Sequence, residues 1–379
     1  MPKNAVFVRG VGSHNGGAEI LLRAASDQIT NDSTRVVADA RKVSKDLRER
    51  WDIGGYFSVP KWGAFESAGL DLLPRSLAQR IDVYSGRHIS AVLDASGFAV
   101  GDQWSSDSIN RDAATFARLR ARGVPIILLP QAFGPFKRAE VAKAAKQLFS
   151  HVDLICARDK ESFDHVVELR GSDDRVMLAP DITIALEAHN VRPSEPKSGG
   201  RVAIVPNINL TARSDDADSM KRYSSSLLSM QQILRKEGFD PFFLLHSAHG
   251  DPTVVAAVSA MDPSIEVIKP RDGLEAKAII GRCDGIIAGR YHAIVSALSQ
   301  GVPAVAHSWS HKYGALLNDF GTTRGLADPM DAEQSTSDLI DLMVDESYRK
   351  AIVGAKPALV RSVETVWEKT HALIANSVA

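Results

Sequence analysis

Residues 285–320 read GIIAGRYHAIVSALSQGVPAVAHSWSHKYGALLNDF, and their pattern decides the fold class. The runs at 285–288 and 304–306 are short, apolar and bordered by Asp, Gly or Pro, which is typical of buried strands. Segments with helical spacing follow each run, at 292–300 and 312–320. Strand and then helix, twice in succession, predicts parallel strands in a sheet that helices cover.

The same alternation runs along most of the chain. In the first half, strands are predicted at Ala5–Val8, Arg35–Ala38, Ile89–Leu93, Pro125–Leu129 and Leu154–Ala157. Helices are predicted between them at Ala18–Ile29, Ile109–Arg122, Ala139–Phe149 and Glu161–Leu169. Further along, strands are predicted at Val202–Val205, Phe242–Leu245 and Ile265–Ile268, and helices at Ser219–Glu237, Thr253–Ala260 and Leu274–Arg282. Two long helical segments, Ser335–Val353 and Pro357–Ser377, close the chain.

A polar stretch, Asn190–Gly200 (NVRPSEPKSGG), interrupts the alternation and is typical of a linker. The length of 379 residues suits two domains. We therefore predict an α/β protein with two doubly wound, Rossmann-like parallel-sheet domains facing a cleft, over residues 1–190 and 201–355. A C-terminal helix, 356–379, is expected to return to the first domain. Ligands of such sheets bind beyond the carboxyl ends of the strands, so function is expected in the cleft.

Composition excludes several classes of protein. The 45 basic and 46 acidic residues nearly cancel, so no overall field draws the chain to nucleic acid. The two cysteines, Cys156 and Cys283, lie in apolar runs, which argues against a disulfide framework and a cysteine-rich zinc site. The N-terminus lacks a signal-peptide pattern, and no apolar run approaches the roughly 20 residues of a membrane helix. We expect a cytoplasmic protein with at most peripheral contact with the inner face of a membrane.

Cations gather where the predicted strands end. Arg290 and His292 follow the strand at 285–288 and start a helix, where backbone N–H groups and the helix dipole favour an anion. His311 and Lys312 follow the next strand in the same way. Adjacent parallel strands end at one edge of a sheet, so these side chains are expected to converge. The alternative is an arginine at the domain edge and a histidine satisfied in the core, but the convergence favours an anion site.

Other strand ends add candidates. His246 follows Phe242–Leu245, and Asp251 is placed to cap the next helix. Asn15 and Gly16 lie in the glycine-rich turn after the first strand, whose spacing misses the dinucleotide fingerprint by one residue. Arg158 is expected to add a cation from the first domain. No HExxH or Cys-His spacing is present, so we predict no metal site.

These motifs together resemble the polysaccharide pyruvyl transferase family. The agreement runs in order along nearly the whole chain: NGGAE at 15–19, QAFGPF at 131–136, R-D-x-x-S from Arg158, Pro180-Asp181, His246, GRYHAIVSALSQGVP and WSHKY. The last two stretches are the most specific. By position, the Arg and His of the family's R-x-H motif fall on Arg290 and His292. The chain departs from the family at 94–97, where relatives often carry a glycine pair, and this departure puts the acceptor-side loop in doubt.

The resemblance implies a fold like that of the B-type glycosyltransferases and an enzyme of polysaccharide biosynthesis for the cell envelope, exopolysaccharide included. Such an enzyme transfers a pyruvyl group from phosphoenolpyruvate to sugar hydroxyls as a pyruvate ketal, without a cofactor. The sugar acceptor is expected to be a nucleotide sugar or a lipid-linked oligosaccharide. The expected donor-binding cations are Arg290, Lys312 and Arg158, with His311, Asn15 and Gly16 completing the substrate site. His292 is the expected general acid, with His246 or His311 as alternatives.

Two other functions stay open at this point. One is a nucleotide-sugar-dependent glycosyltransferase of the same architecture, in which Glu275 or Asp272 would bind the ribose. The other is a non-catalytic relative that only binds a glycan. The acceptor sugar, the ketal linkage and the oligomeric state, a homo-oligomer included, also stay open.

Overall fold

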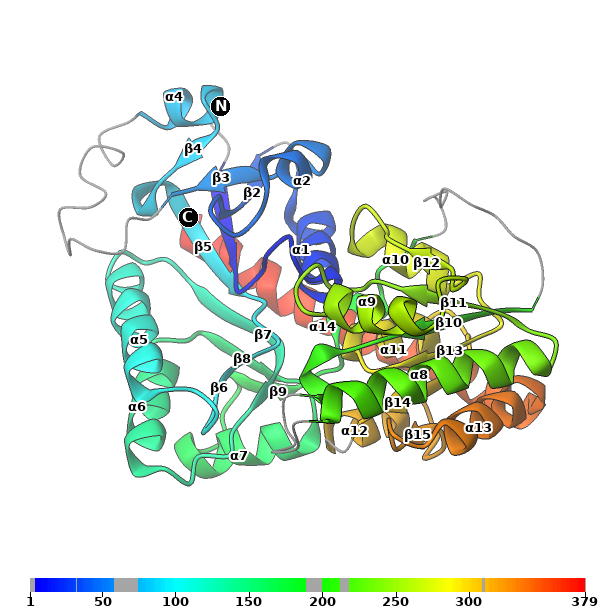
Figure 1. Cartoon of the computed structure of the whole chain (residues 1–379). Coiled ribbons are helices and arrows are strands. Elements are labelled where there is room, and N and C mark those ends of the chain that lie inside the picture. Colours follow the sequence, from blue (N-terminus) through cyan, green and yellow to red (C-terminus); the bar gives the residue numbers. More distant parts are fainter. Residues whose placement is uncertain are drawn as a thin grey trace. The chain divides into compact units, whose positions relative to one another are not determined.

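The computed structural model describes residues 4–31, 33–57, 74–188, 200–211, 218–308 and 311–378. It contains two compact units, each with its own parallel sheet (Figure 1). The first unit comprises Met1–Ser13, Leu21–Ile182 and Arg361–Ala379, and the second comprises His14–Ile20 and Thr183–Val360. The predicted linker lies outside the described residues apart from Gly200.

The sheet of the first unit has the strand order β4-β3-β2-β1-β5-β7-β8-β9, and β6 pairs with β7. Its strands are β1 (Asn4–Arg9), β2 (Thr34–Asp39), β3 (Gly54–Tyr56), β4 (Val83–Tyr84), β5 (Ile89–Asp94), β6 (Phe98–Val100), β7 (Ile126–Phe133), β8 (Leu154–Ala157) and β9 (Val176–Leu178). All of the pairings are parallel. The direction of winding reverses between β1 and β5, which creates a topological switch point.

Helices join these strands. They are α1 (Gly16–Ile29), α2 (Lys45–Arg50), α4 (Arg75–Arg80), α5 (Ser106–Arg120), α6 (Ala139–Ser150) and α7 (Lys160–Arg170). Side chains at their starts satisfy free backbone N–H groups, as Ser105 does for α5 and Asp159 for α7. Helix α5 packs along α6, and apolar residues of both helices join the sheet in one core that includes Phe116 and Phe149.

The sheet of the second unit has the order β12-β11-β10-β13-β14-β15 and is also parallel throughout. Its strands are β10 (Arg201–Val205), β11 (Asp240–Leu244), β12 (Val267–Ile268), β13 (Gly285–Ala288), β14 (Ala304–His307) and β15 (Leu326–Ala327). Winding reverses between β10 and β13, so this unit has a switch point as well. The prediction of two doubly wound parallel sheets is confirmed.

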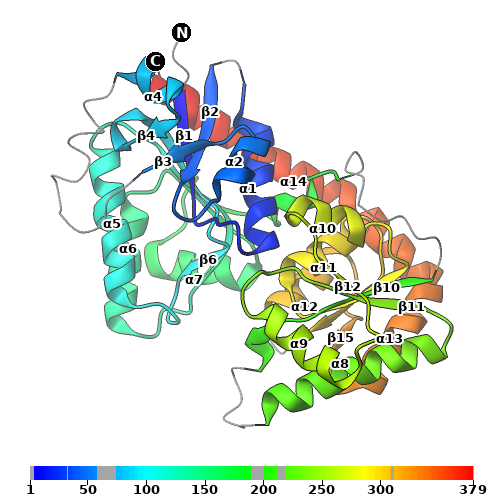
Figure 2. The ribbon, with the colours of Figure 1, turned by 45° about the horizontal axis from the view of Figure 1, so that its top comes forward.

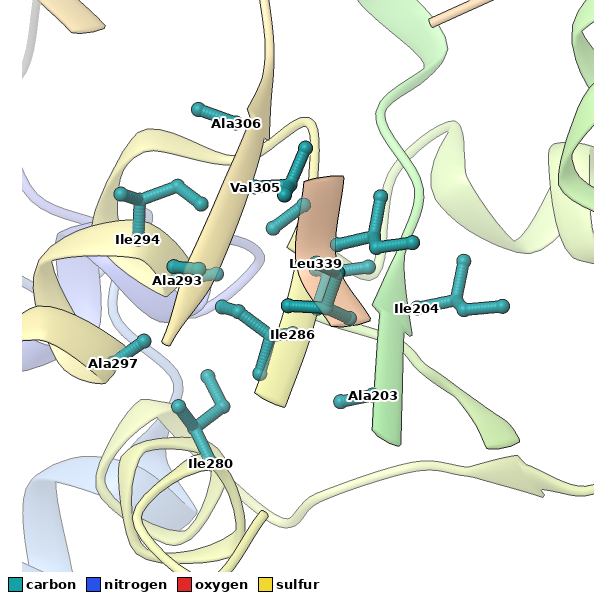
Figure 3. Packing of buried hydrophobic residues seen from close by; sticks show 14 of the residues in the cluster. Ala203, Ile204, Ile280, Ile286, Ala293, Ile294, Ala297, Val305, Ala306 and Leu339 are labelled. Carbon is teal, nitrogen blue, oxygen red and sulfur yellow. The ribbon is translucent and has the colours of Figure 1, made fainter. Parts of the chain in front are cut away.

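The helices of the second unit are α8 (Ser219–Lys236), α9 (Asp251–Met261), α10 (Gly273–Ile280), α11 (Tyr291–Leu298), α12 (His311–Asp319), α13 (Ala332–Val344) and the first part of α14 (Glu346–Val378). Helix α8 contacts α9 and α13, and α11 contacts α10 (Figure 2). Figure 3 shows Ala293 of α11 and Leu339 of α13 near Ile286 of β13, all three fully buried. Near-continuous apolar strands are what a sheet covered on both faces requires.

The helix boundary near the end of the chain was predicted wrongly. Pro357 was expected to begin the last helix, because proline favours a first helical position. It lies instead inside α14, which starts at Glu346. The Asp345 carboxylate accepts hydrogen bonds from the N–H groups of Ser347 and Tyr348, and this cap sets the break.

Candidate active site

The turns that follow β13 and β14 lie at the same edge of the second unit's sheet. Strands β13 and β14 are parallel neighbours, with Ala288 paired to Ala306. Arg290 is the residue before α11, and Lys312 lies in the first turn of α12. The histidine between them, His307, is buried inside β14 and hydrogen-bonds Ser335, so it belongs to the core. The turns after β13 and β14 therefore lie at the same edge of the sheet, and the convergence of all four side chains on one anion stays a prediction.

Arg290 is held by a carboxylate that lies on another element. Its Nε donates to Asp251 Oδ2 at 2.9 Å, and its Nη2 contacts Asp251 Oδ1, which makes a two-pronged ion pair. The Asp251 side chain is fully buried, and burial raises the pKa of its carboxyl while the guanidinium opposes that rise. The predicted capping role of Asp251 is wrong: Gly250 precedes α9, and the carboxylate turns to Arg290 and to the N–H of Ile208.

His246 lies just beyond β11 and is 3% exposed. Neither of its ring nitrogens has a hydrogen-bond partner among the described residues. Burial, and next the positive charges of His292 and Arg290, lower the pKa of His246 to about 3. The imidazole is therefore neutral at pH 7.

His292 is fixed by the glycine-rich turn at the start of α1, whose residues 14–20 belong to the second unit. A Cβ on Gly17 would lie 2.3 Å from His292 Nδ1, so only glycine leaves room for this ring. A Cβ on Gly16 would lie 3.0 Å from the carbonyl oxygen of His246. The turn therefore packs directly against both histidines.

Hydrogen bonds hold this turn in place. The N–H of Gly16 donates to the carbonyl of His246 at 2.8 Å. Asn15 Oδ1 accepts from the N–H of Gly17 at 2.9 Å, as a helix cap does. Glu19 Oε2 accepts from the N–H of Gly273 at 2.6 Å, at the start of α10. The NGGAE stretch at 15–19 thus anchors the turn to His246 and to the start of α10.

Aromatic residues bring Lys312 to the same neighbourhood. Its Nζ lies 5.9 Å from the ring centre of Tyr291 and 5.4 Å from that of Tyr313. The Tyr291 ring lies 5.4 Å from the His292 ring, edge to face. Tyr313 donates a hydrogen bond to the carbonyl of Gly289, which stabilises the turn before Arg290. The side chain of His311 and residues 309–310 lie outside the described part of the chain.

Arg158 belongs to the first unit. Its side chain is buried and pairs with Asp181 at 3.3 Å, which offsets its charge. Asp159 caps α7 by accepting a hydrogen bond from the N–H of Ser162. The part of Arg158 in donor binding stays a prediction.

Three contacts around the two histidines were not predicted from the sequence. Asp251 pairs with Arg290, Gly17 packs against the His292 ring, and Glu19 holds the glycine-rich turn through Gly273. The NGGAE stretch at 15–19 was the available signal for Gly17 and Glu19. Within the described ranges, no group of three or more His, Cys, Asp or Glu residues is placed to hold a metal ion. None of the described helices is long and apolar enough to cross a membrane. Cys156 and Cys283 are both free and buried.

Comparison with known proteins gives a family and a fold. The family model for polysaccharide pyruvyl transferases matches residues 6–311. No curated protein matches the chain in sequence. Among solved structures, the chain is similar to a UDP-GlcNAc 2-epimerase from Neisseria meningitidis bound to UDP-GlcNAc, with a TM-score of 0.62 and 11% identity over 97% of this chain and 99% of that one.

Two further structures show the same likeness. The S. aureus protein MnaA in complex with UDP gives a TM-score of 0.61 and 13% identity, over 96% of this chain and 94% of that one. The Anabaena protein HepE in complex with UDP and glucose gives 0.58 and 12%, over 98% and 99%. At these identities the likeness concerns the fold, and it confirms the two-domain, Rossmann-like architecture of B-type glycosyltransferases.

Proposed function

The chain belongs to the polysaccharide pyruvyl transferase family, and from this premise we propose that it transfers a pyruvyl group from phosphoenolpyruvate to sugar hydroxyls, forming a pyruvate ketal. The observation that carries the proposal is the pairing of Arg290 with fully buried Asp251 beside two histidines of the same unit. Phosphoenolpyruvate places a phosphate and a carboxylate on three carbons, so its site needs a fixed cation and hydrogen-bond donors close together.

Donor binding is assigned to the turn before α11. The guanidinium of Arg290 uses Nε and Nη2 on Asp251, and its other Nη is free of that pair, so it is available to an anion. The start of α11 adds backbone N–H groups and the positive end of a helix dipole. Lys312 adds a second positive charge near Tyr291. Arg158 stays the expected contribution of the first unit.

The reaction requires a proton on the methylene carbon of the donor. His292 delivers this proton in its imidazolium form, because the phosphate and carboxylate beside it favour the charged ring. Carbon 2 then becomes an oxocarbenium-like centre that a sugar hydroxyl attacks. Phosphate leaves with the electrons of its bond to carbon 2, and a second hydroxyl attacks the same carbon to close the ketal. One hydroxyl proton returns to His292 and replaces the proton given to the methylene carbon, and the other goes to the departing phosphate, which leaves as hydrogen phosphate.

His246 has a different part in this proposal. Its pKa of about 3 keeps it neutral at pH 7, which does not suit a general acid. A neutral imidazole whose nitrogens have no described partner can instead hydrogen-bond a substrate oxygen. We therefore assign the proton transfer to His292 and substrate binding to His246.

A nucleotide-sugar-dependent glycosyltransferase is the second candidate, because the similar MnaA and HepE structures hold UDP. The two acids that would bind its ribose already have other partners. Asp272 accepts from the N–H groups of Leu274 and Glu275 at the start of α10. The Glu275 carboxylate is buried and accepts from Arg271. This arrangement favours pyruvyl transfer.

The test incubates the purified full chain with phosphoenolpyruvate and a panel of sugar acceptors and measures the product by mass spectrometry. Ketal formation adds the mass of pyruvate less one water and releases inorganic phosphate. Thermal unfolding with phosphoenolpyruvate or with UDP, on wild type and on Arg290→Ala, gives a measure of binding that needs no acceptor. Stabilisation by UDP alone, with no pyruvylated product from any acceptor, would overturn the proposal in favour of the glycosyltransferase.

A further inference from the structure

A pocket of about 740 Å³ lies within the first unit, apart from every residue to which the proposed chemistry is assigned. It is lined by residues at the carboxyl ends of β1, β2 and β3 and by one face of helix α5. It therefore lies beside the switch point between β1 and β5, where doubly wound sheets bind ligands. Its volume suits a ligand much larger than a three-carbon donor.

Two arginines of the pocket are already neutralised. Arg9 lies 3.3 Å from Asp94 through Nε and donates to Asp112 through Nη2 at 2.7 Å. Arg41 pairs with Asp39 through two nitrogens. These pairs shape the wall of the pocket and leave little net charge.

Three further cations have no such partner. Lys42, Arg111 and Arg118 line the pocket and form no ion pair with any described residue. Arg118 donates one hydrogen bond, to the Thr115 hydroxyl at 3.5 Å. All three are exposed, so solvent or a ligand meets them directly. The pocket therefore carries a positive charge that the protein leaves uncompensated.

The spacing of these cations indicates an extended anion. Arg111 and Arg118 are seven residues apart on α5, which puts them on one face about 10 Å apart along the helix axis. Lys42 comes from the segment after β2. A single carboxylate would meet one of these groups, whereas two linked phosphates can meet several at once.

The rest of the wall suits rings. Phe7 and Tyr56 stack with centroids 4.1 Å apart, and both line the pocket. Phe116 lies under the Arg9 guanidinium at 5.0 Å, and the Trp104 side chain is partly exposed at the rim. Aromatic faces bind the apolar face of a sugar ring or a base by contact area. Rings beside cations match a sugar attached to a diphosphate.

We infer that this pocket binds the sugar acceptor through a diphosphate that joins the sugar to its carrier. The inference rests on the proposed function only in naming the ligand as the acceptor; the binding itself needs no phosphoenolpyruvate. The carrier is a nucleoside or an isoprenoid lipid, since both present the same diphosphate to Lys42, Arg111 and Arg118.

Calorimetric titration of the full chain tests the inference with three probes: UDP-glucose, N-acetylglucosaminyl diphosphate esterified to a farnesyl chain, and uncharged methyl glucoside. One or both diphosphate probes should bind, and methyl glucoside should bind at least a hundredfold more weakly. The double variant Arg111→Gln/Arg118→Gln keeps the helix and removes two cations. It should weaken diphosphate binding by about a hundredfold, about tenfold for each lost charge-assisted contact.

The matched control is Arg120→Gln on the same helix. Arg120 pairs with Asp153 and does not line the pocket, so this variant should bind the probes within about twofold of wild type. The preferred diphosphate probe identifies the carrier. Absence of binding by both diphosphate probes, equal binding by methyl glucoside, or equal losses in Arg120→Gln and the double variant would each overturn the inference.

Thermal stabilisation by phosphoenolpyruvate, measured on the same variants, separates this inference from the proposed function. It should be unchanged in Arg111→Gln/Arg118→Gln, because the donor is assigned to the second unit. Donor stabilisation without diphosphate binding contradicts the pocket alone, and diphosphate binding at the pocket without donor stabilisation contradicts the donor assignment alone.

Discussion

The carboxyl edges of the two sheets differ in how they hold their arginines. In the second unit, the side chain of Arg290 is 13% exposed and its partner Asp251 is fully buried. In the first unit, Arg111 and Arg118 extend into solvent without a described carboxylate. A guanidinium fixed before the ligand arrives suits bond-making, which requires atoms within a few tenths of an ångström. Solvated arginines on one helix face suit recognition of a charged group that varies in position.

Removing Arg290, the arginine held by a buried carboxylate, should cause the largest loss of activity. Arg290→Ala leaves the Asp251 carboxylate buried without its cation and the donor without its main charge partner. We expect a loss of about 2 to 4 kcal/mol of transition-state stabilisation, measured as kcat/KM for phosphoenolpyruvate. Arg290→Lys should also lose most activity, since an ammonium cannot form the two-pronged pair. The control is Arg324→Ala, an exposed arginine paired with Asp345 elsewhere in the unit. Wild-type kcat/KM in Arg290→Ala would remove this residue from donor binding.

The acid assignment is tested by His292→Gln, because an amide donates a hydrogen bond and does not titrate. Turnover should fall on the order of a hundredfold, with the dissociation constant for phosphoenolpyruvate near that of wild type. His246→Gln should mainly raise the KM, because the neutral His246 ring is assigned to binding. If His292→Gln turns over normally while His246→Gln does not, the two histidines have been assigned the wrong way round.

Gly17→Ala tests how far the fixed geometry of the second unit matters, because it displaces only the His292 ring. The added Cβ would lie 2.3 Å from His292 Nδ1, so the ring must move while the backbone of residue 17 needs no unusual conformation. We expect turnover to fall about thirtyfold with little change in the unfolding temperature. The control is Gly314→Ala in α12, where a Cβ meets nothing within 4 Å. Full turnover in Gly17→Ala would show that this packing does not position His292.

The smallest expected effect is on stability against acid. Burial lowers the pKa of His307 to about 3, and His246 has a similar value, against about 6.5 in the unfolded chain. Below pH 6.5 the unfolded chain binds protons that the folded second unit excludes until about pH 3, so stability falls as the pH falls across this window. Each histidine contributes about 1.4 kcal/mol per pH unit. His307→Gln should reduce that slope by one histidine's share in urea unfolding from pH 6 to pH 4.5; an unchanged slope would contradict the assignment.

Much of the fold was predictable because its strands are long enough to show a pattern. Strand β8 was predicted with its observed bounds, and the central strands within a few residues. The strands β3, β4, β6, β9 and β15 were missed, since two or three residues such as Gly54–Tyr56 carry no measurable period. They form because a neighbouring strand offers hydrogen bonds, which is a property of the sheet and not of the local sequence.

The candidate site also contains residues that the sequence predicts and residues that it does not. Arg290 and His292 were predictable because a strand end and a helix start adjoin in sequence. The partner of Arg290 was not, because the sequence offered Asp251 a local role as a cap and the ion pair joins positions 39 residues apart. The contact of Gly17 with His292 spans an even longer separation and depends on the absence of a side chain, which no periodic pattern records.

The anchoring of the glycine-rich turn has a consequence for how the chain is made. Glu19 accepts a hydrogen bond from Gly273, 254 positions later, within one compact unit. Ribosomes add about 5 to 20 residues per second, so the turn waits roughly 10 to 50 s for its partners. Gly16 and Gly17 also wait, because His246 follows Gly16 by 230 positions (246 − 16) and His292 follows Gly17 by 275 positions (292 − 17). The His246 and His292 rings therefore pack against this turn only late in biosynthesis, and a nascent chain that stops before α11 has the turn without His292.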